Sequence, residues 1–143
     1  MENSVKFKDR NVLYRSVLKE LNLQKIEDVY SRRDMGNYFI TFSAEKFLIQ
    51  YVNDRNQLSI FVASNSAPAR WVYLSSIEKL INKTAEIIPG DSMDLNSILR
   101  QNDFLRGNFD KIAELLNNDN FQNTIDQIEA SAKANYKRKH PDR

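Results

Sequence analysis

Cysteine is absent from this 143-residue chain, glycine and proline occur only three times each, and there is a single histidine. Without cysteine the chain cannot form disulfides, use a thiol nucleophile or bind a metal through thiolates. The scarcity of glycine and proline argues against a barrel or sandwich with many tight turns. The one histidine, His140, stands beside a proline in a charged C-terminal segment, where a preorganised catalytic geometry is hard to maintain.

Long apolar runs are also missing. No stretch of 18 apolar residues occurs, and the first 15 residues lack the apolar core of a signal peptide, so we expect no membrane span and a cytoplasmic protein. Apolar residues make up 41% of the chain and charged residues 28%, which is typical of a soluble globular domain. The length suffices for one domain with a single core and is too short for two ordinary ones.

The net charge of +2 is unevenly distributed. Residues 37–132 carry eight Lys or Arg against twelve Asp or Glu, whereas residues 133–143 carry five against one. A basic tail of this kind can bind a phosphate backbone, so a nucleic-acid-binding regulator is the alternative function that the composition keeps open. A solvated, frayed helix end explains the same residues more simply, and the acidic body would repel nucleic acid.

Periodicity predicts the N-terminal half. Apolar residues recur at spacings of three and four between Asp9 and Leu23, which predicts an amphipathic helix, and a short strand is expected around Ile26 to Tyr30. The period then changes to two, and β-branched and aromatic residues dominate, as in strands of an antiparallel meander. The expected strands cover residues 38–43, 47–52 and 58–63.

The polar residues Asn53–Asn56 separate the last two of these strands. A four-residue turn there pairs Tyr51 with Leu58 and Ile49 with Ile60, and it keeps one face of the hairpin apolar. Turn formation therefore explains the acid and the base at its centre.

Helical patterns fill the C-terminal half. Ser75 with Glu78 three residues later predicts a capping box and a helix that ends near Lys83. A further pattern covers 92–116, as one helix or as two, and the last helix begins at Phe121. We therefore predict an α+β fold with an N-terminal helix, an antiparallel meander of three to four strands, and three to four C-terminal helices packed on one sheet face. Residues 1–137 would form this single domain, with 138–143 as the basic, frayed tail.

No set of residues predicts catalysis, a cofactor or a metal. Asp91, Ser92 and Asp94 weakly resemble calcium ligands, but the glycine and distal glutamate of a calcium loop are missing, and a helix cap explains this group of residues better. There is no glycine-rich phosphate loop. Carboxylate pairs are harder to exclude, because acids distant in sequence can meet in a cleft. We expect a protein that is not an enzyme.

Several motifs together resemble a family of small bacterial immunity-type proteins, which are inhibitors that neutralise a cognate toxin by binding it. They are Gly36-Asn37-Tyr38, the hairpin 52–57, Trp71-x-x-Leu74, the segment 104–112 and Phe121-x-x-Thr124. The resemblance covers residues 36–137 and implies a protein-binding function without catalytic residues. It also implies that a local ion pair between Asp54 and Arg55 braces the hairpin loop. Such inhibitors use charge complementarity and a few buried anchors. Trp71 is expected to pack where sheet meets helix, and it becomes an anchor if exposed. The candidate partner-binding residues are Arg32, Arg33, Asp54, Arg55 and Trp71.

Overall fold

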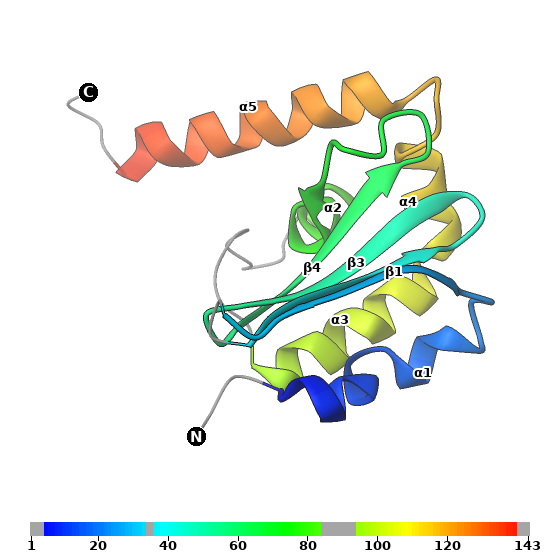
Figure 1. Cartoon of the computed structure of the whole chain (residues 1–143). Coiled ribbons are helices and arrows are strands. Elements are labelled where there is room, and N and C mark those ends of the chain that lie inside the picture. The colour runs from blue at the N-terminus through cyan, green and yellow to red at the C-terminus, as the bar shows by residue number, and fades with distance from the viewer. Residues whose placement is uncertain (1–4, 34–35, 84–93, 140–143) are drawn as a thin grey trace.

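An antiparallel β-sheet with helices packed against it forms the body of the protein (Figure 1). The computed structural model describes residues 5–33, 36–83 and 94–139, without the side chains of 135–139. Asp91, Ser92 and residues 140–143 of the predicted tail therefore lie outside the described residues. Within those residues no helix is both long enough and apolar enough to cross a bilayer. The predicted α+β class is confirmed.

The sheet has five strands in sequence order, where three to four were predicted. They are β1 (Gln24–Ser31), β2 (Asn37–Ser43), β3 (Phe47–Asp54), β4 (Gln57–Ser64) and β5 (Val72–Tyr73). Each strand pairs antiparallel with the next, so β1 and the two-residue β5 are the edges. The predicted segment around Ile26 is thus a full strand of eight residues, with a bulge between Lys25 and Glu27.

The predicted N-terminal helix from Asp9 to Leu23 is wrong in detail. The segment forms a 3-10 helix, η1 (Phe7–Leu13), and one α-helical turn, α1 (Arg15–Leu18). Tyr14 separates them because its backbone leaves the helical region, at φ −127° and ψ −1°. Its ring packs 4.7 Å from that of Phe42, so tertiary contact with the sheet outweighs helical continuity.

Four helices follow the sheet: α2 (Leu74–Ile81), α3 (Leu95–Gly107), α4 (Phe109–Leu115) and α5 (Phe121–Lys139). The segment predicted as one helix or two is therefore two, divided at Asn108. Asp94 caps α3 by accepting a hydrogen bond from the Ser97 N–H at 2.8 Å, which confirms the cap. This bond holds the pKa of Asp94 below its usual value.

The predicted capping box is wrong, because α2 begins one residue earlier and Ser75 lies inside it. Glu78 does not reach back to the helix start. Its carboxylate is buried and accepts hydrogen bonds from Arg100 at 2.9 Å and from Gln101 at 3.4 Å, both on α3. An interhelical ion pair therefore replaces the local cap.

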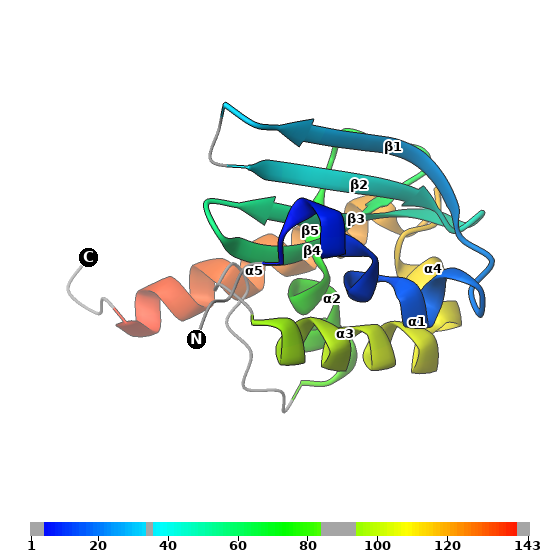
Figure 2. The same cartoon turned by 60° about the horizontal axis from the view of Figure 1, so that its bottom comes forward.

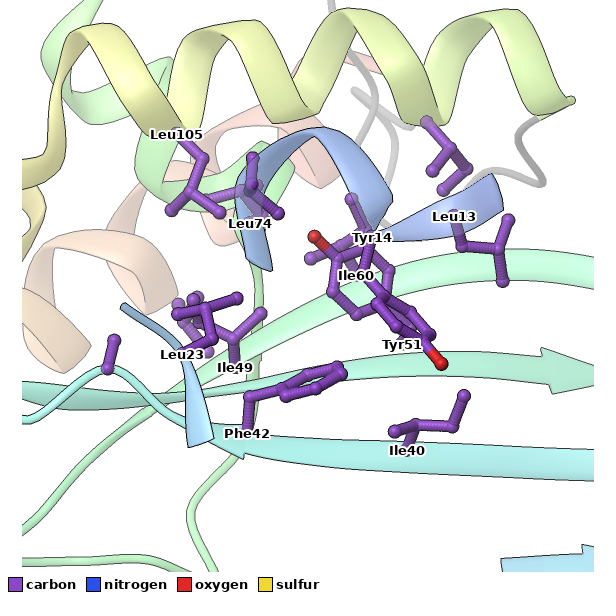
Figure 3. Close-up of a cluster of buried hydrophobic side chains, with 14 of the residues drawn as sticks. Leu13, Tyr14, Leu23, Ile40, Phe42, Ile49, Tyr51, Ile60, Leu74 and Leu105 are labelled. Carbon is purple, nitrogen blue, oxygen red and sulfur yellow. The ribbon is translucent and has the colours of Figure 1, made fainter. Parts of the chain in front are cut away.

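One sheet face forms the core under η1, α1 and α3 (Figure 2). Tyr51 lies at its centre and donates a hydrogen bond from its hydroxyl to Asn102 Oδ1 at 2.7 Å. The Asn102 amide donates in turn to the Leu13 carbonyl at 2.7 Å, so this fully buried residue connects sheet, η1 and α3. The strand residues of this core are Tyr38, Ile40, Phe42, Phe47, Ile49, Tyr51, Leu58, Ile60 and Val62, several of them drawn in Figure 3.

The β3–β4 hairpin has a tighter turn than predicted. Asp54 pairs with Gln57, and Tyr51 faces Ile60 rather than Leu58, a shift of two residues. The turn consists of Arg55 and Asn56, both at positive φ (53° and 66°). A two-residue hairpin loop needs positive φ at both positions if it is to match the twist of its strands. A shift of two preserves which side chains share a face, so the predicted apolar face is confirmed although its register is wrong.

Candidate protein-binding surface

In the described residues, η1, α1 and α3 lie on the core side of the sheet, and no helix is drawn over the second face at β1, β2 and β3 (Figures 1 and 2). Because side chains alternate along a strand, the residues between the core positions point to this side. The strand register places them in rows across neighbouring strands. We call this surface the open face and define it as Val29, Phe39, Thr41, Leu48, Gln50, Val52, Ser59, Phe61 and Tyr73.

Apolar side chains occupy much of the open face. Val29, Phe39 and Val52 form one row over β1, β2 and β3, and Val29 is 39% exposed. In the neighbouring row the rings of Phe61 and Tyr73 lie 4.5 Å apart. These two rings and the side chains of Phe39 and Val52 are half-buried, which leaves a contiguous apolar surface in contact with water.

The polar residues at the centre of the open face satisfy each other. The Gln50 amide donates a hydrogen bond to Thr41 Oγ1 at 3.0 Å, across β2 and β3. Thr41 is already buried, so this bond mainly removes part of the desolvation cost that the half-buried Gln50 would add when a partner covers it. A partner can therefore cover the centre of the face at a low cost in desolvation free energy.

Four of the five predicted partner-binding residues meet at one end of the open face. Arg32 and Arg33 follow the last residue of β1, and Asp54 and Arg55 form the hairpin tip. Asn37, the first residue of β2, joins the two turns: its amide donates to Asp54 Oδ1 at 3.2 Å, and its Oδ1 accepts from the Arg55 N–H at 2.7 Å.

This arrangement corrects the expected brace of the hairpin. No ion pair between Asp54 and Arg55 occurs among the described residues, and the Asn37 carboxamide holds the tip instead. Asn37 was visible only as part of a turn signal, since nothing in its local sequence indicates a contact 17 residues away. The Arg55 side chain remains exposed and available for a partner.

Trp71 is not brought to this end. It precedes β5, whose residues pair with the later part of β4, so it lies toward the opposite end of the sheet. Trp71 is half-buried, so it is neither fully packed between sheet and helix nor fully exposed as an anchor. Arg70 beside it bonds Glu129 of α5 at 2.8 Å, which fixes this loop to the last helix.

Two surface carboxylates, Asp28 of β1 and Asp103 of α3, have basic partners. Burial tends to raise the pKa of Asp28, but hydrogen bonds from Arg10 at 2.7 Å and Lys25 at 3.1 Å outweigh it and hold the pKa below its usual value. Asp103 is paired with Arg106. In the part of the chain that the structure describes, no three His, Cys, Asp or Glu side chains are grouped as metal ligands would be.

Two surface hollows lie away from the open face. One of about 620 Å³ is lined by residues that include Lys46, Ser64, Asp110 and Glu114, and Lys46 Nζ lies 4.0 Å from Asp110. The other, of about 370 Å³, lies between the N-terminal segment and the β1–β2 end of the sheet. It contains Asn53, whose Oδ1 has no hydrogen-bond partner but is itself shielded from solvent.

Comparisons with protein-family models, with curated proteins and with solved structures found no match for this chain.

Proposed function

We propose that this chain is a protein-binding domain that acts as an immunity factor, neutralising a cognate toxin by binding it directly through the open face. The observation that carries the proposal is the uncovered sheet face, on which apolar side chains surround the Thr41–Gln50 pair. A sheet with one face on the core commonly has a polar second face, so apolar side chains retained there call for a binding partner.

The composition of the face supports a protein as the partner. Interface centres are rich in aromatic and aliphatic side chains, and their rims are polar. Phe39, Phe61 and Tyr73 supply the aromatic surface, and the charged turns at one end supply part of the rim. Burying a side chain such as Phe61 contributes about 1 to 2 kcal/mol, so each such anchor strengthens binding about five- to thirtyfold.

The charged end of the face supports selectivity and fast association. Arg32, Arg33 and Arg55 are exposed, and they lie at the same end of the sheet as Asp54. A partner with an acidic patch at the matching position would be steered to this end, and a basic one would be repelled. These rim charges are expected to affect the association rate more than the lifetime of the complex.

Toxin neutralisation is the finer part of the proposal, and it rests on the resemblance to immunity-type proteins. A rigid surface suits an inhibitor, because little conformational entropy is lost when it binds. The open face is built on strands whose opposite side chains are fully buried, including Ile40, Ile49 and Ile60. The same face can therefore be presented before and after binding.

The test uses the protein encoded beside the gene of this chain. We would induce that protein in bacteria with and without the chain, measure growth, and measure binding of the two purified proteins by calorimetry. Phe39→Thr and Phe61→Thr remove apolar area while keeping residues that favour strands. Each should weaken binding about tenfold or more, and the pair should abolish protection.

Lys19→Ala is the matched control, since Lys19 is exposed and follows α1 in the helix layer beneath the sheet (Figure 1). It should bind and protect like the unchanged chain. Absence of both protection and binding would overturn the immunity proposal. Binding that the Phe39 and Phe61 substitutions leave unchanged would overturn the role of the open face. Strong oligonucleotide binding that falls steeply with salt would instead favour the nucleic-acid alternative.

A further inference from the structure

Edge strand β1 has a distribution of side chains that the open face does not explain. In the described residues, the large apolar side chains that are exposed are Ile26 (57%), Val29 (39%) and Tyr30 (43%), and all three belong to β1. An exposed edge with apolar side chains is a template for pairing with another strand. Proteins that must avoid such pairing shorten, bend or charge the edge.

The bulge of β1 protects only its first part. The register with β2 shifts between Lys25 and Glu27, whereas Asp28 to Ser31 pair regularly with Ile40 to Asn37. Tyr30 in this regular part is held in place by stacking on Phe7, with ring centroids 4.1 Å apart. The second half of the strand therefore pairs regularly with β2 and carries the exposed apolar side chains of Val29 and Tyr30.

Charges at the two ends of this half are opposite. Glu27 precedes it, and Arg32 and Arg33 follow it. All three side chains are exposed, and none of them takes part in an ion pair within the described part of the chain. A strand with an acid at one end and bases at the other is complementary to an antiparallel copy of itself.

We propose that β1 pairs with β1 of a second copy of this chain, antiparallel about a two-fold axis that passes beside Tyr30. In an antiparallel pairing about a two-fold axis, one strand advances as the other recedes. The numbers of facing residues therefore always add to twice the number of the residue beside the axis. With Tyr30 on the axis, Glu27 lies opposite Arg33 of the second copy, and Asp28 lies opposite its Arg32. Each contact occurs twice by symmetry.

This register places the two Tyr30 rings beside each other at the centre of the interface. It also joins the two sheets into one of ten strands, so the open faces of the two copies become continuous. The inference concerns the backbone edge of β1, not the open face of the sheet, although Val29, Arg32 and Arg33 border both. It is tested without any partner protein, so the failure of one does not decide the other.

Charge reversal across the axis gives the sharpest test. Sedimentation equilibrium of the whole chain should show a reversible dimer. Glu27→Arg and Arg33→Glu should each weaken dimerisation about tenfold or more, because each replaces two attractions by two repulsions. An equimolar mixture of the two variants should form a heterodimer as stable as the original, since opposite charges then face each other again.

Glu114→Arg is the control, because Glu114 is an exposed acid on α4, away from β1, and should leave the dimer unchanged. Circular dichroism of every variant verifies folding, and recovery in the mixture separates a charge effect from misfolding. A chain that stays monomeric at all concentrations would overturn the proposal. So would a dimer that ignores both reversals, or two dissociated variants that fail to associate when mixed.

Discussion

Asn102 connects three elements through two buried hydrogen bonds, and Asn102→Ala tests how much that connection contributes to stability. The residue is fully buried on α3, accepts from the Tyr51 hydroxyl and donates to the Leu13 carbonyl, both at 2.7 Å. Alanine keeps the helix but removes both partners. The Tyr51 hydroxyl and the Leu13 carbonyl are then left buried and unpaired.

The size of the effect follows from these contacts. Each buried polar group left unpaired costs about 1 to 3 kcal/mol, and the missing carboxamide adds a small cavity. We therefore expect Asn102→Ala to reduce the free energy of unfolding by about 4 kcal/mol. For a chain of this size, that corresponds to a fall in Tm of about 12 °C.

A double-mutant cycle isolates the bond between the two side chains. Tyr51→Phe alone should cost about 1.5 kcal/mol, because it leaves Asn102 Oδ1 unpaired. Once the hydroxyl is gone, Asn102→Ala orphans only the Leu13 carbonyl. The double variant should therefore be less destabilised than the sum of the two by about 1 kcal/mol or more.

Urea unfolding followed by circular dichroism measures all four free energies of the cycle. Asn96→Ala is the control, since Asn96 is exposed on the same helix and should change stability by less than about 0.5 kcal/mol. If Asn102→Ala costs no more than this control, or if the two substitutions are additive, the connecting role of Asn102 is refuted.

Three further predictions concern other parts of the fold. Burial raises the pKa of Tyr51, so above pH 10 the unfolded chain loses the hydroxyl proton while the folded chain keeps it. The free energy of unfolding therefore falls as the pH rises, and Tyr51→Phe should make that fall shallower in urea titrations at pH 9 to 11. Replacing Arg55-Asn56 by Asn-Gly should stabilise the hairpin by about 1 kcal/mol, because both positions have positive φ; a loss of stability in thermal unfolding would contradict this turn geometry. Arg100→Ala should destabilise by about 2 kcal/mol in urea unfolding, since it removes the main partner of the Glu78 carboxylate, whose side chain is only 6% exposed; an unchanged midpoint would show that Glu78 is not held by this pair.

Period-two alternation was sufficient to predict the meander and its buried face, because that pattern depends only on which side chains must leave water. It could not fix the hairpin register, since a shift of two residues keeps the same face apolar. The tight turn is chosen by strand twist, and Arg55 and Asn56 are not the Asn-Gly pair that usually announces it. Local patterns also misplaced the start of α2, where Glu78 pairs with Arg100, 22 residues away.

The candidate surface was predictable only in part. Arg32, Arg33, Asp54 and Arg55 could be named as exposed charged residues, but their meeting at one end of the sheet depends on Asn37 and on the meander topology. Phe39 and Phe61 lie between the core positions of their strands, and alternation alone does not show whether a second layer covers that side. Phe39 and Phe61 are accessible to a partner because the helices that cover the sheet lie on its core face.

The most direct measurement of the central claim is the affinity of this chain for the protein encoded beside its gene, by calorimetry, before and after Phe39→Thr and Phe61→Thr are combined. We predict tight binding by the unchanged chain and by Lys19→Ala, and a loss of about a hundredfold or more in the double variant. Equal affinity of all three proteins would contradict binding through the open face.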